Sequence, residues 1–142
     1  MSFLSSMDIS GSALTAQRLR MDVIAENIAN AETTRTANGQ PYRRKFVLMG
    51  EKENSFSQYL DRAMAAGNGV QVTHIVEDDS PLTPLYNPSH PDADENGYVY
   101  MPNINTVTEM IDMMSATRSY EANITAVNAL KNMAFKSLEI GK

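Results

Sequence analysis

The sequence contains no cysteine and no tryptophan, and it has only two histidines, His74 and His90. Without cysteine the chain cannot form disulfides, thiolate metal sites or a thiol nucleophile. The two histidines lack the close spacing that paired ligands of a zinc site require. No apolar run approaches the ~20 residues needed to cross a bilayer, and the first residues lack the features of a secretory signal. We therefore expect neither a membrane span nor passage by the general secretory route.

Basic residues are also scarce: 12 Lys and Arg stand against 17 Asp and Glu, so the formal charge is -5 over 142 residues. This balance argues against nucleic acid as a partner, because phosphate affinity comes from a surplus of basic side chains. The glycine-rich loops that hold nucleotides and the nucleophile elbow of hydrolases are absent as well. We predict one domain that is no enzyme and that takes no cofactor, metal or small-molecule substrate.

The first part of the chain has a helical pattern. Met7, Leu14, Met21 and Ile28 recur every seven residues, which places them on one stripe of a helix. Gly11 and Arg18 weaken the intermediate positions of that seam. The pattern predicts a helix over about 7–30, ended by the turn-forming residues that follow it.

The last third of the chain has a longer helical pattern. The positions that alternate by three and four residues are Met110, Met113, Thr117, Tyr120, Ile124, Val127, Lys131, Ala134 and Leu138. They predict a helix over 104–139, which at ~1.5 Å per residue is roughly 54 Å long. Asn105 or Thr106 is the expected cap, with Glu109 in capping-box spacing to Thr106, and Gly141 is the expected stop.

A short mixed segment separates these helices. Strands are predicted at 42–49, 70–76 and 98–101, with a short helix at 56–66. The predicted fold is mainly α: the helical regions 1–34 and 103–142 form one discontinuous domain by pairing as a coiled coil, and 35–102 form a small α+β insert.

Charge and proline are concentrated within this insert. The region 77–97 carries six acidic residues, no basic residue and four prolines, whereas 35–45 is basic. Because proline fixes φ and lacks an N–H donor, 77–97 is predicted to be a surface loop with neither a helix nor a central strand.

Two chemical readings of the acidic residues remain open. Asp92, Asp94, Asn96 and Gly97 reproduce the opening of an EF-hand calcium loop, but its twelfth position is Asn103 and prolines replace the flanking helices. A soluble calcium-responsive module is therefore the alternative to a structural role, and an acidic turn is the simpler reading. Asp61, Glu77, Asp78 and Asp79 offer carboxylates for a hydrolase acting on the cell wall, without a pattern that pairs them about a cleft.

Both helices carry apolar residues outside their main seams, including Val23, Ile111, Met114 and Phe135. One partner helix covers one stripe, so the second surface packs either on the insert or on neighbouring chains. The ten methionines suit interfaces with several different neighbours, although they also fill ordinary cores.

Three motifs in order resemble a known family. They are MDVIAENIANAETT at 21–34, which continues as far as PYRRK at 41–45, then NPSHPDADENGYVYMPN at 87–103, and SYEAN at 119–123. With the Asn27-x-x-Asn30-x-x-Thr33 arrangement, the chain resembles the flagellar axial proteins, and a component of the proximal rod more than the other rod and hook proteins.

The resemblance implies a subunit exported by the flagellar type III apparatus and assembled into the rod of the bacterial basal body, which crosses the periplasm. There it would join copies of itself and other rod proteins, near ring and export-apparatus components, in a helical tube that transmits torque and lines the export channel. The family motif falls on Asn27, Asn30, Thr33, Glu121 and Asn123. The helix seams expected at subunit interfaces comprise Met7, Leu14, Met21, Ile28, Met110, Met113, Tyr120, Ile124, Val127 and Leu138. We expect Tyr120 to pack across the seam and Asn123 to bond an adjacent chain.

Opposite charges suggest how such subunits keep register. Arg43, Arg44 and Lys45 are expected to meet Asp92 and Asp94 of a neighbour, since charge complementarity sets orientation more than affinity.

Overall fold

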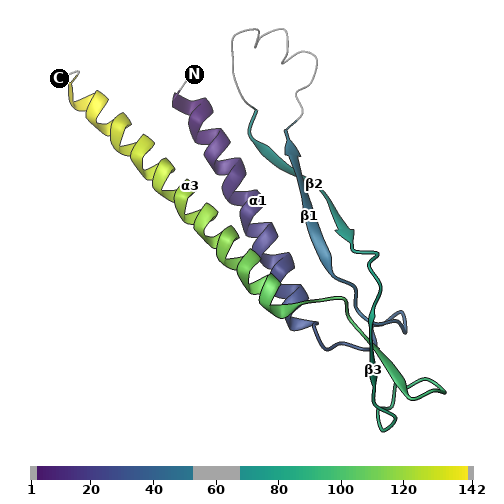
Figure 1. Cartoon of the computed structure of the whole chain (residues 1–142). Helices are drawn as coiled ribbons and strands as arrows, with labels where there is room; N and C mark the ends of the chain where they lie inside the picture. Colours follow the sequence, from purple (N-terminus) through teal and green to yellow (C-terminus); the bar gives the residue numbers. More distant parts are fainter. Residues whose placement is uncertain (1–2, 53–67, 141–142) are drawn as a thin grey trace.

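The computed structural model describes residues 3–52 and 68–140. Two long helices, α1 (Phe3–Ala29) and α3 (Thr106–Ile140), run antiparallel, so both termini lie at the same end of the molecule (Figure 1). Four short strands lie between them in the chain: β1 (Lys45–Glu51), β2 (Val70–Glu77), β3 (Thr83–Tyr86) and β4 (Tyr98–Met101). The mainly helical fold with a short-stranded insert is confirmed. The helix predicted at 56–66 lies outside the described residues.

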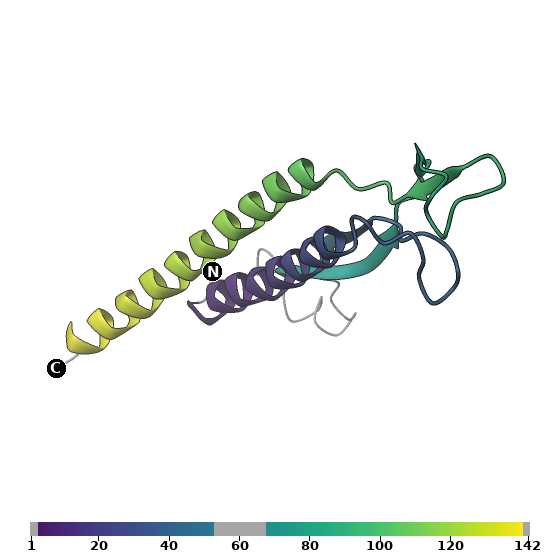
Figure 2. The same ribbon diagram turned by 90° about the horizontal axis from the view of Figure 1, so that it is seen from below.

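Helix α1 occupies the middle of the structure. Among the helices and strands, α1 contacts α3 on one side and β1 and β2 on the other, whereas α3 contacts α1 alone (Figures 1 and 2). The buried residues of α1 are accordingly Ala16, Val23, Ile24 and Asn27. The two helices pack against each other as predicted, and their coiled-coil geometry stays a prediction.

Asparagine side chains bond backbone groups at the end of α1 and at the start of α3, where the helical pair meets the insert. Asn30 Nδ2 donates to Glu26 O (2.9 Å) at the end of α1. At the start of α3, Asn105 Oδ1 accepts from Val107 N (3.0 Å) and Thr108 N (3.2 Å), which makes Asn105 the N-cap. The capping box predicted for Thr106 and Glu109 is wrong, because the Glu109 carboxylate turns into the interior.

The face of α3 that meets α1 is shifted by one residue from several predicted seam positions. Its buried and half-buried positions are Glu109, Asp112, Met113, Ala116, Thr117, Ser119, Tyr120, Asn123, Val127, Leu130 and Ala134. Met113, Tyr120 and Val127 of the predicted seam lie on this face. Met110 is 55% exposed and Leu138 is 71% exposed, so both lie off it. One residue is ~100° on a helix, and so a shift of one moves a side chain to another face.

The strands form two separate antiparallel hairpins. β1 pairs with β2 from Lys45↔Glu77 to Glu51↔Val70, with an irregularity between Leu48 and Met49. The predicted strand at 42–49 starts later than expected, because residues 42–44 lead into the sheet from the end of α1.

The second hairpin corrects the loop prediction for 77–97. β3 pairs with β4 from Thr83↔Met101 to Tyr86↔Tyr98. Pro84 is tolerated because each strand of a two-stranded sheet has one edge that needs no donor. The strand predicted at 98–101 is confirmed as β4.

The contact between α1 and the start of β2 gives a first prediction. Gly69 has φ +82°, and a Cβ there would collide with Ser12 Oγ, which accepts from Val70 N (3.0 Å). We expect Gly69→Ala to lower the free energy of unfolding by roughly 1–3 kcal/mol. Gly11→Ala is the matched control, since Gly11 lies in α1 beside open space, and it should raise that free energy by up to about 1 kcal/mol. Urea unfolding followed by circular dichroism measures both; equal effects of the two variants would contradict the prediction.

Candidate functional site

The side-chain amide of Asn27, at the end of α1, is fully buried and bonds to three other parts of the chain. Its Nδ2 donates to Lys45 O (2.7 Å) and to Glu109 Oε2 (3.0 Å). Its Oδ1 accepts from Lys45 N (2.9 Å) and from Tyr42 OH (3.2 Å). One amide therefore fastens the end of α1 to the first residue of β1 and to the first turn of α3. We call Asn27, Tyr42, Arg44, Lys45 and Glu109 the polar junction.

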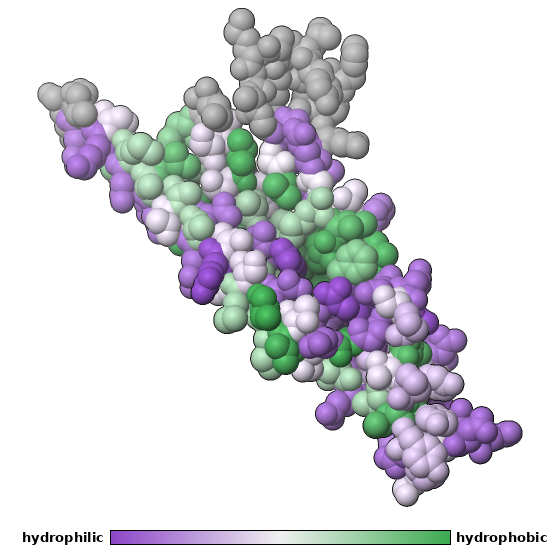
Figure 3. Space-filling model, in the orientation of Figure 1, coloured by the Kyte–Doolittle hydropathy of each residue, from purple (hydrophilic) through white to green (hydrophobic). Residues whose placement is uncertain are grey.

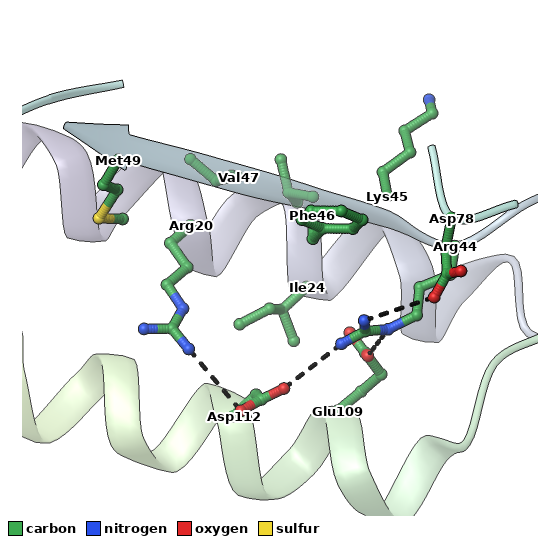
Figure 4. A pocket seen from close by; sticks show the side chains of 11 residues that line it. Arg20, Ile24, Arg44, Lys45, Phe46, Val47, Met49, Asp78, Glu109 and Asp112 are labelled. Carbon is green, nitrogen blue, oxygen red and sulfur yellow. Dashed lines mark hydrogen bonds and ion pairs between the residues drawn. The ribbon is translucent and has the colours of Figure 1, made fainter. Parts of the chain in front are cut away.

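An ion pair completes the junction. The Glu109 carboxylate is 1% exposed, and its Oε1 accepts from Arg44 Nε at 2.6 Å (Figure 4). The same guanidinium lies 3.4 Å from Asp112 Oδ2 and 3.9 Å from Asp78 Oδ2, and Arg20 lies 3.7 Å from the other oxygen of Asp112. Removing one partner of a buried pair costs about 3–5 kcal/mol, because the other charge is left without compensation. The network thus joins α1, α3 and one end of the first hairpin, where Arg44 precedes β1 and Asp78 follows β2.

A groove opens beside this network, between α1, α3 and β1. Its volume is about 620 Å³. Val23 and Ile24 of α1 line it together with Phe46, Val47 and Met49 of β1. Figure 4 shows Ile24 between β1 and α3, with Arg20 reaching across to Asp112. The groove exists because β1 and α3 lie on different sides of α1 without touching each other.

The residues of the family motif fall into two groups. Asn27, Asn30 and Thr33 lie together, because Thr33 Oγ1 donates to Asn30 Oδ1 (3.1 Å), next to the bond from Asn30 to Glu26 O. Asn123 lies far along α3, where its Nδ2 donates to Ser119 O (2.8 Å). Glu121 is exposed on the same helix. The expected bond from Asn123 to an adjacent chain stays a prediction.

The basic and acidic segments of the insert meet within one chain. Arg35 lies 3.3 Å from Asp92, whose other oxygen accepts from Thr34 Oγ1 (2.9 Å). Lys45 Nζ lies 2.8 Å from Glu26 Oε1. Arg43 donates to two carbonyls, Asp78 O and Ser80 O, both at 3.3 Å.

The calcium-like sequence forms a turn. Asp94 Oδ1 accepts from Asn96 N (2.9 Å) and Tyr98 N (3.0 Å), and Gly97 has φ 82°. Asp92 and Asp94 are thus bonded to other groups of the chain, and the part of the chain that the structure describes has no cluster of three acidic or histidine side chains that could hold a metal ion. The structure offers no support for the calcium reading.

The second functional feature is a stripe of apolar side chains on α3 that faces away from α1. Val107 is 64%, Met110 55%, Ile111 58% and Met114 56% exposed, at spacings of three and four residues. We call these four residues the free stripe. Hydrophobic residues are visible at the surface over the first turns of α3 (Figure 3). Within the described ranges, no helix is long and apolar enough to span a membrane.

Sequence patterns did not identify Tyr42, Arg20 or the inward position of Glu109. Their partners are remote along the chain: Arg44 and Glu109 are 65 residues apart. Within the short motif PYRRK, however, Tyr42 and Arg44 stood among the residues that carried the family resemblance.

The role of Asn27 gives a second prediction. Asn27→Ala would remove the buried partner of the Lys45 backbone and of Glu109 Oε2, although Arg44 would still bond Glu109 Oε1, so the free energy of unfolding should fall by roughly 2–4 kcal/mol. Asn30→Ala is the matched control, because its amide bonds an exposed carbonyl of its own helix; the expected loss is about 0.5–1 kcal/mol. Chemical unfolding followed by helical ellipticity compares the two. Equal losses would show that Asn27 is an ordinary helix-end residue.

Tyr42 makes the stability of the junction depend on pH. Burial, reinforced by the negative charge of Glu26, raises the pKa of Tyr42 from 10.0 to about 12. Because the folded-state pKa is the higher one, the stabilisation is complete below pH 10 and is lost as pH rises to 12, by about 2 kcal/mol. Tyr42→Phe should therefore flatten the fall in stability over this range. Titration of tyrosinate absorbance, with the variant subtracted, checks the pKa; an unchanged alkaline slope would contradict the assignment.

Comparison with known proteins places the whole chain in one family. The description "Flagella basal body rod protein" matches residues 7–35, and "Flagellar basal body rod FlgEFG protein C-terminal" matches 95–140. Flagellar basal-body rod protein FlgC of Bacillus subtilis is 52% identical over 100% of both chains. The FlgC proteins of Borreliella burgdorferi (45%, over 99% of this chain and 98% of the relative) and Escherichia coli O6:H1 (43%, over 100% of both) are similar throughout. The chain belongs to the FlgC family of flagellar basal-body rod proteins.

Proposed function

We propose that this chain, a structural subunit of the flagellar basal-body rod, builds the proximal part of the rod. Copies of it and other rod proteins would pack into a helical tube that transmits torque and surrounds the export channel. The observation that carries the proposal is the free stripe of α3. Among the described elements, α3 is covered by α1 alone, so half of a long helix remains for neighbours.

Apolar exposure of this kind calls for a protein partner. Soluble monomers rarely expose a contiguous apolar patch of more than a few hundred Å². Val107, Met110, Ile111 and Met114 form such a stripe without a charged residue among them. Two of the four are methionines, whose flexible side chains adapt to neighbours that differ in shape. That property suits a helical tube in which one helix meets several different surfaces.

Transmission of torque requires that the insert and the helical pair turn together. The polar junction supplies this connection, because Asn27 joins α1 to β1 and Glu109 joins both to α3. Charged and amide groups in fixed geometry resist sliding better than aliphatic contacts do, since each misplaced group stays buried without a partner. The proposed role is structural and requires no catalytic residue.

The interface positions predicted from the helical pattern remain part of this proposal. Met110, Ile124 and Leu138 are exposed and available to other rod proteins. Met7, Leu14, Met21, Ile28, Met113, Tyr120 and Val127 are half-buried and would meet neighbours through their exposed edges. Basal-body ring and export-apparatus components are further partners in this proposal.

Ion pairs within the chain leave fewer charged residues for a register contact between subunits. Arg44, Lys45 and Asp92 have ion-pair partners in their own chain, which leaves Arg43 and Asp94 without one among the described residues. A register contact between subunits would therefore involve Arg43 or Asp94 first.

Substitution within the free stripe tests the proposal. Met114→Asp places a charge at the last position of the stripe without touching α1, so the helicity of the purified chain should stay unchanged while incorporation into basal bodies falls at least tenfold, since burying an unpaired charge costs several kcal/mol. Ser115→Asp, the neighbouring exposed residue on another face, is the control and should assemble normally. Quantitative mass spectrometry of isolated basal bodies, with swimming assays, gives the readout. Normal incorporation of Met114→Asp would refute the stripe as an interface.

A further inference from the structure

The sequence contains three asparagine–glycine pairs: Asn38-Gly39, Asn68-Gly69 and Asn96-Gly97. Their glycines have φ of 76°, 82° and 82°, so all three pairs lie in turns that favour glycine. Asparagine is a thermolabile residue. Because glycine has no side chain to shield its backbone nitrogen, this nitrogen can reach the side-chain amide of the asparagine before it. The three pairs share this chemistry, so differences in their reactivity must come from the surrounding structure.

The pair at Asn96 is fixed by the β3–β4 hairpin. Gly97 N donates to Asp94 O (2.9 Å), and Gly97 O accepts from Asn87 N (2.9 Å). Asp94 Oδ1 also accepts from Asn96 N (2.9 Å). A Cβ on Gly97 would lie 3.0 Å from the Tyr86 ring, so the space around this glycine is filled. The glycine nitrogen therefore reaches the Asn96 amide only when the end of the hairpin opens.

The pair at Asn68 is fixed by contact with α1. Gly69 packs so closely on this helix that a Cβ would collide with Ser12 Oγ. Val70 N donates to the same hydroxyl (3.0 Å), and Gly69 O accepts from Lys52 N (3.1 Å). Rotation of the peptide between Asn68 and Gly69 would break this connection between α1 and the first hairpin.

The pair at Asn38 lies in an open turn. Residues 37–40 are all exposed, and a Cβ on Gly39 would meet no atom within 4 Å. The bonds of the turn join near neighbours in the sequence: Gly39 N donates to Thr36 O (2.9 Å), and Thr36 N and Oγ1 both donate to Gln40 O at 2.8 Å. Figure 2 shows the loop that follows α1 extending away from this helix. Such a turn opens at little cost in free energy, because the bonds that it loses are local.

We propose that Asn38 is a site of spontaneous deamidation. The Gly39 nitrogen, after losing its proton to water or hydroxide, attacks the carbonyl carbon of the Asn38 side chain. The new C–N bond closes a succinimide ring, and the side-chain nitrogen leaves with the electron pair of its bond to carbon and takes up a proton to become ammonia. Water then adds to one of the two ring carbonyls and breaks its bond to the ring nitrogen, which gives aspartate or isoaspartate.

The modification changes the turn in charge and in length. Either product adds one negative charge to the basic segment 35–45, which has no acidic residue. Isoaspartate also places one more carbon in the main chain between Thr36 and Gln40, whose hydrogen bonds close the turn. Arg35, just before this turn, pairs with Asp92. The modified turn therefore adjoins the contact between the basic segment and the loop between β3 and β4.

Incubation of the purified full-length chain at mildly alkaline pH tests the assignment. One sample is kept folded and one is unfolded in guanidinium chloride, and peptide mass spectrometry measures aspartate and isoaspartate at all three asparagines. In the unfolded chain the three should react at similar rates, because glycine follows each of them. In the folded chain Asn38 should keep roughly that rate, whereas Asn68 and Asn96 should react at least about tenfold more slowly. Strong protection of Asn38, or equal rates at all three asparagines of the folded chain, would overturn the proposal.

A variant of the hairpin tests whether the structure causes the difference. Asp94→Ala removes the side-chain acceptor of Asn96 N and Tyr98 N. Modification of Asn96 in the folded chain should then become about threefold to tenfold faster, because the end of the hairpin opens more often. The rate at Asn38 should stay unchanged, which makes this asparagine the internal control. An unchanged rate at Asn96 would refute the argument that the bonds of the turn decide which asparagine reacts.

Discussion

The Asn27 amide imposes one constraint on three segments of the chain. An amide has two N–H donors and a carbonyl acceptor, and here both kinds of group are used, toward the Lys45 backbone, Tyr42 and Glu109. Aspartate has the same shape but donates nothing, and it would set a second carboxylate against Glu109. Glutamine is longer by one carbon and would displace β1 from the end of α1. The position therefore requires an amide of this length, which explains why a buried polar residue ends a helix that is otherwise apolar on this face.

The junction replaces part of a hydrophobic core that this chain is too elongated to build. The buried apolar residues are few: Ala16, Val23, Ile24, Tyr42, Val99 and Ala116. Burying Glu109 beside Arg44 costs desolvation free energy that aliphatic residues would not incur. The buried polar groups nevertheless restrict the two helices to one relative position, because any shift of α3 along α1 leaves a carboxylate or an amide without its partner. For a structural subunit of the rod, fixed geometry between insert and helices matters more than maximal stability.

The sequence predicted the features that depend on neighbouring residues and missed those that depend on distant ones. Both helices were located to within about four residues, since the alternation of three and four residues is a local property. The strand at Tyr98–Met101 was also found, whereas β3 was missed because Pro84 argues against a strand unless its edge position is known. Glu109 was read as a capping residue because its spacing fits that role, and its real partner is Arg44, brought close only by the tertiary fold. The seam on α3 was displaced because its most buried members, Glu109 and Ala116, are not large apolar residues.

The distribution of contacts explains why the chain resembles a component more than a finished domain. Helix α1 is packed on two sides, yet α3 is covered along one side only, and its last turns lack even that cover. Each hairpin has just two strands, which on their own are marginal in water. Thr34 and Arg35 bond Asp92 in the loop between β3 and β4. A neighbour that covers the exposed Tyr86, Tyr98 and Tyr100 would remove aromatic surface from water and extend the packing of this hairpin.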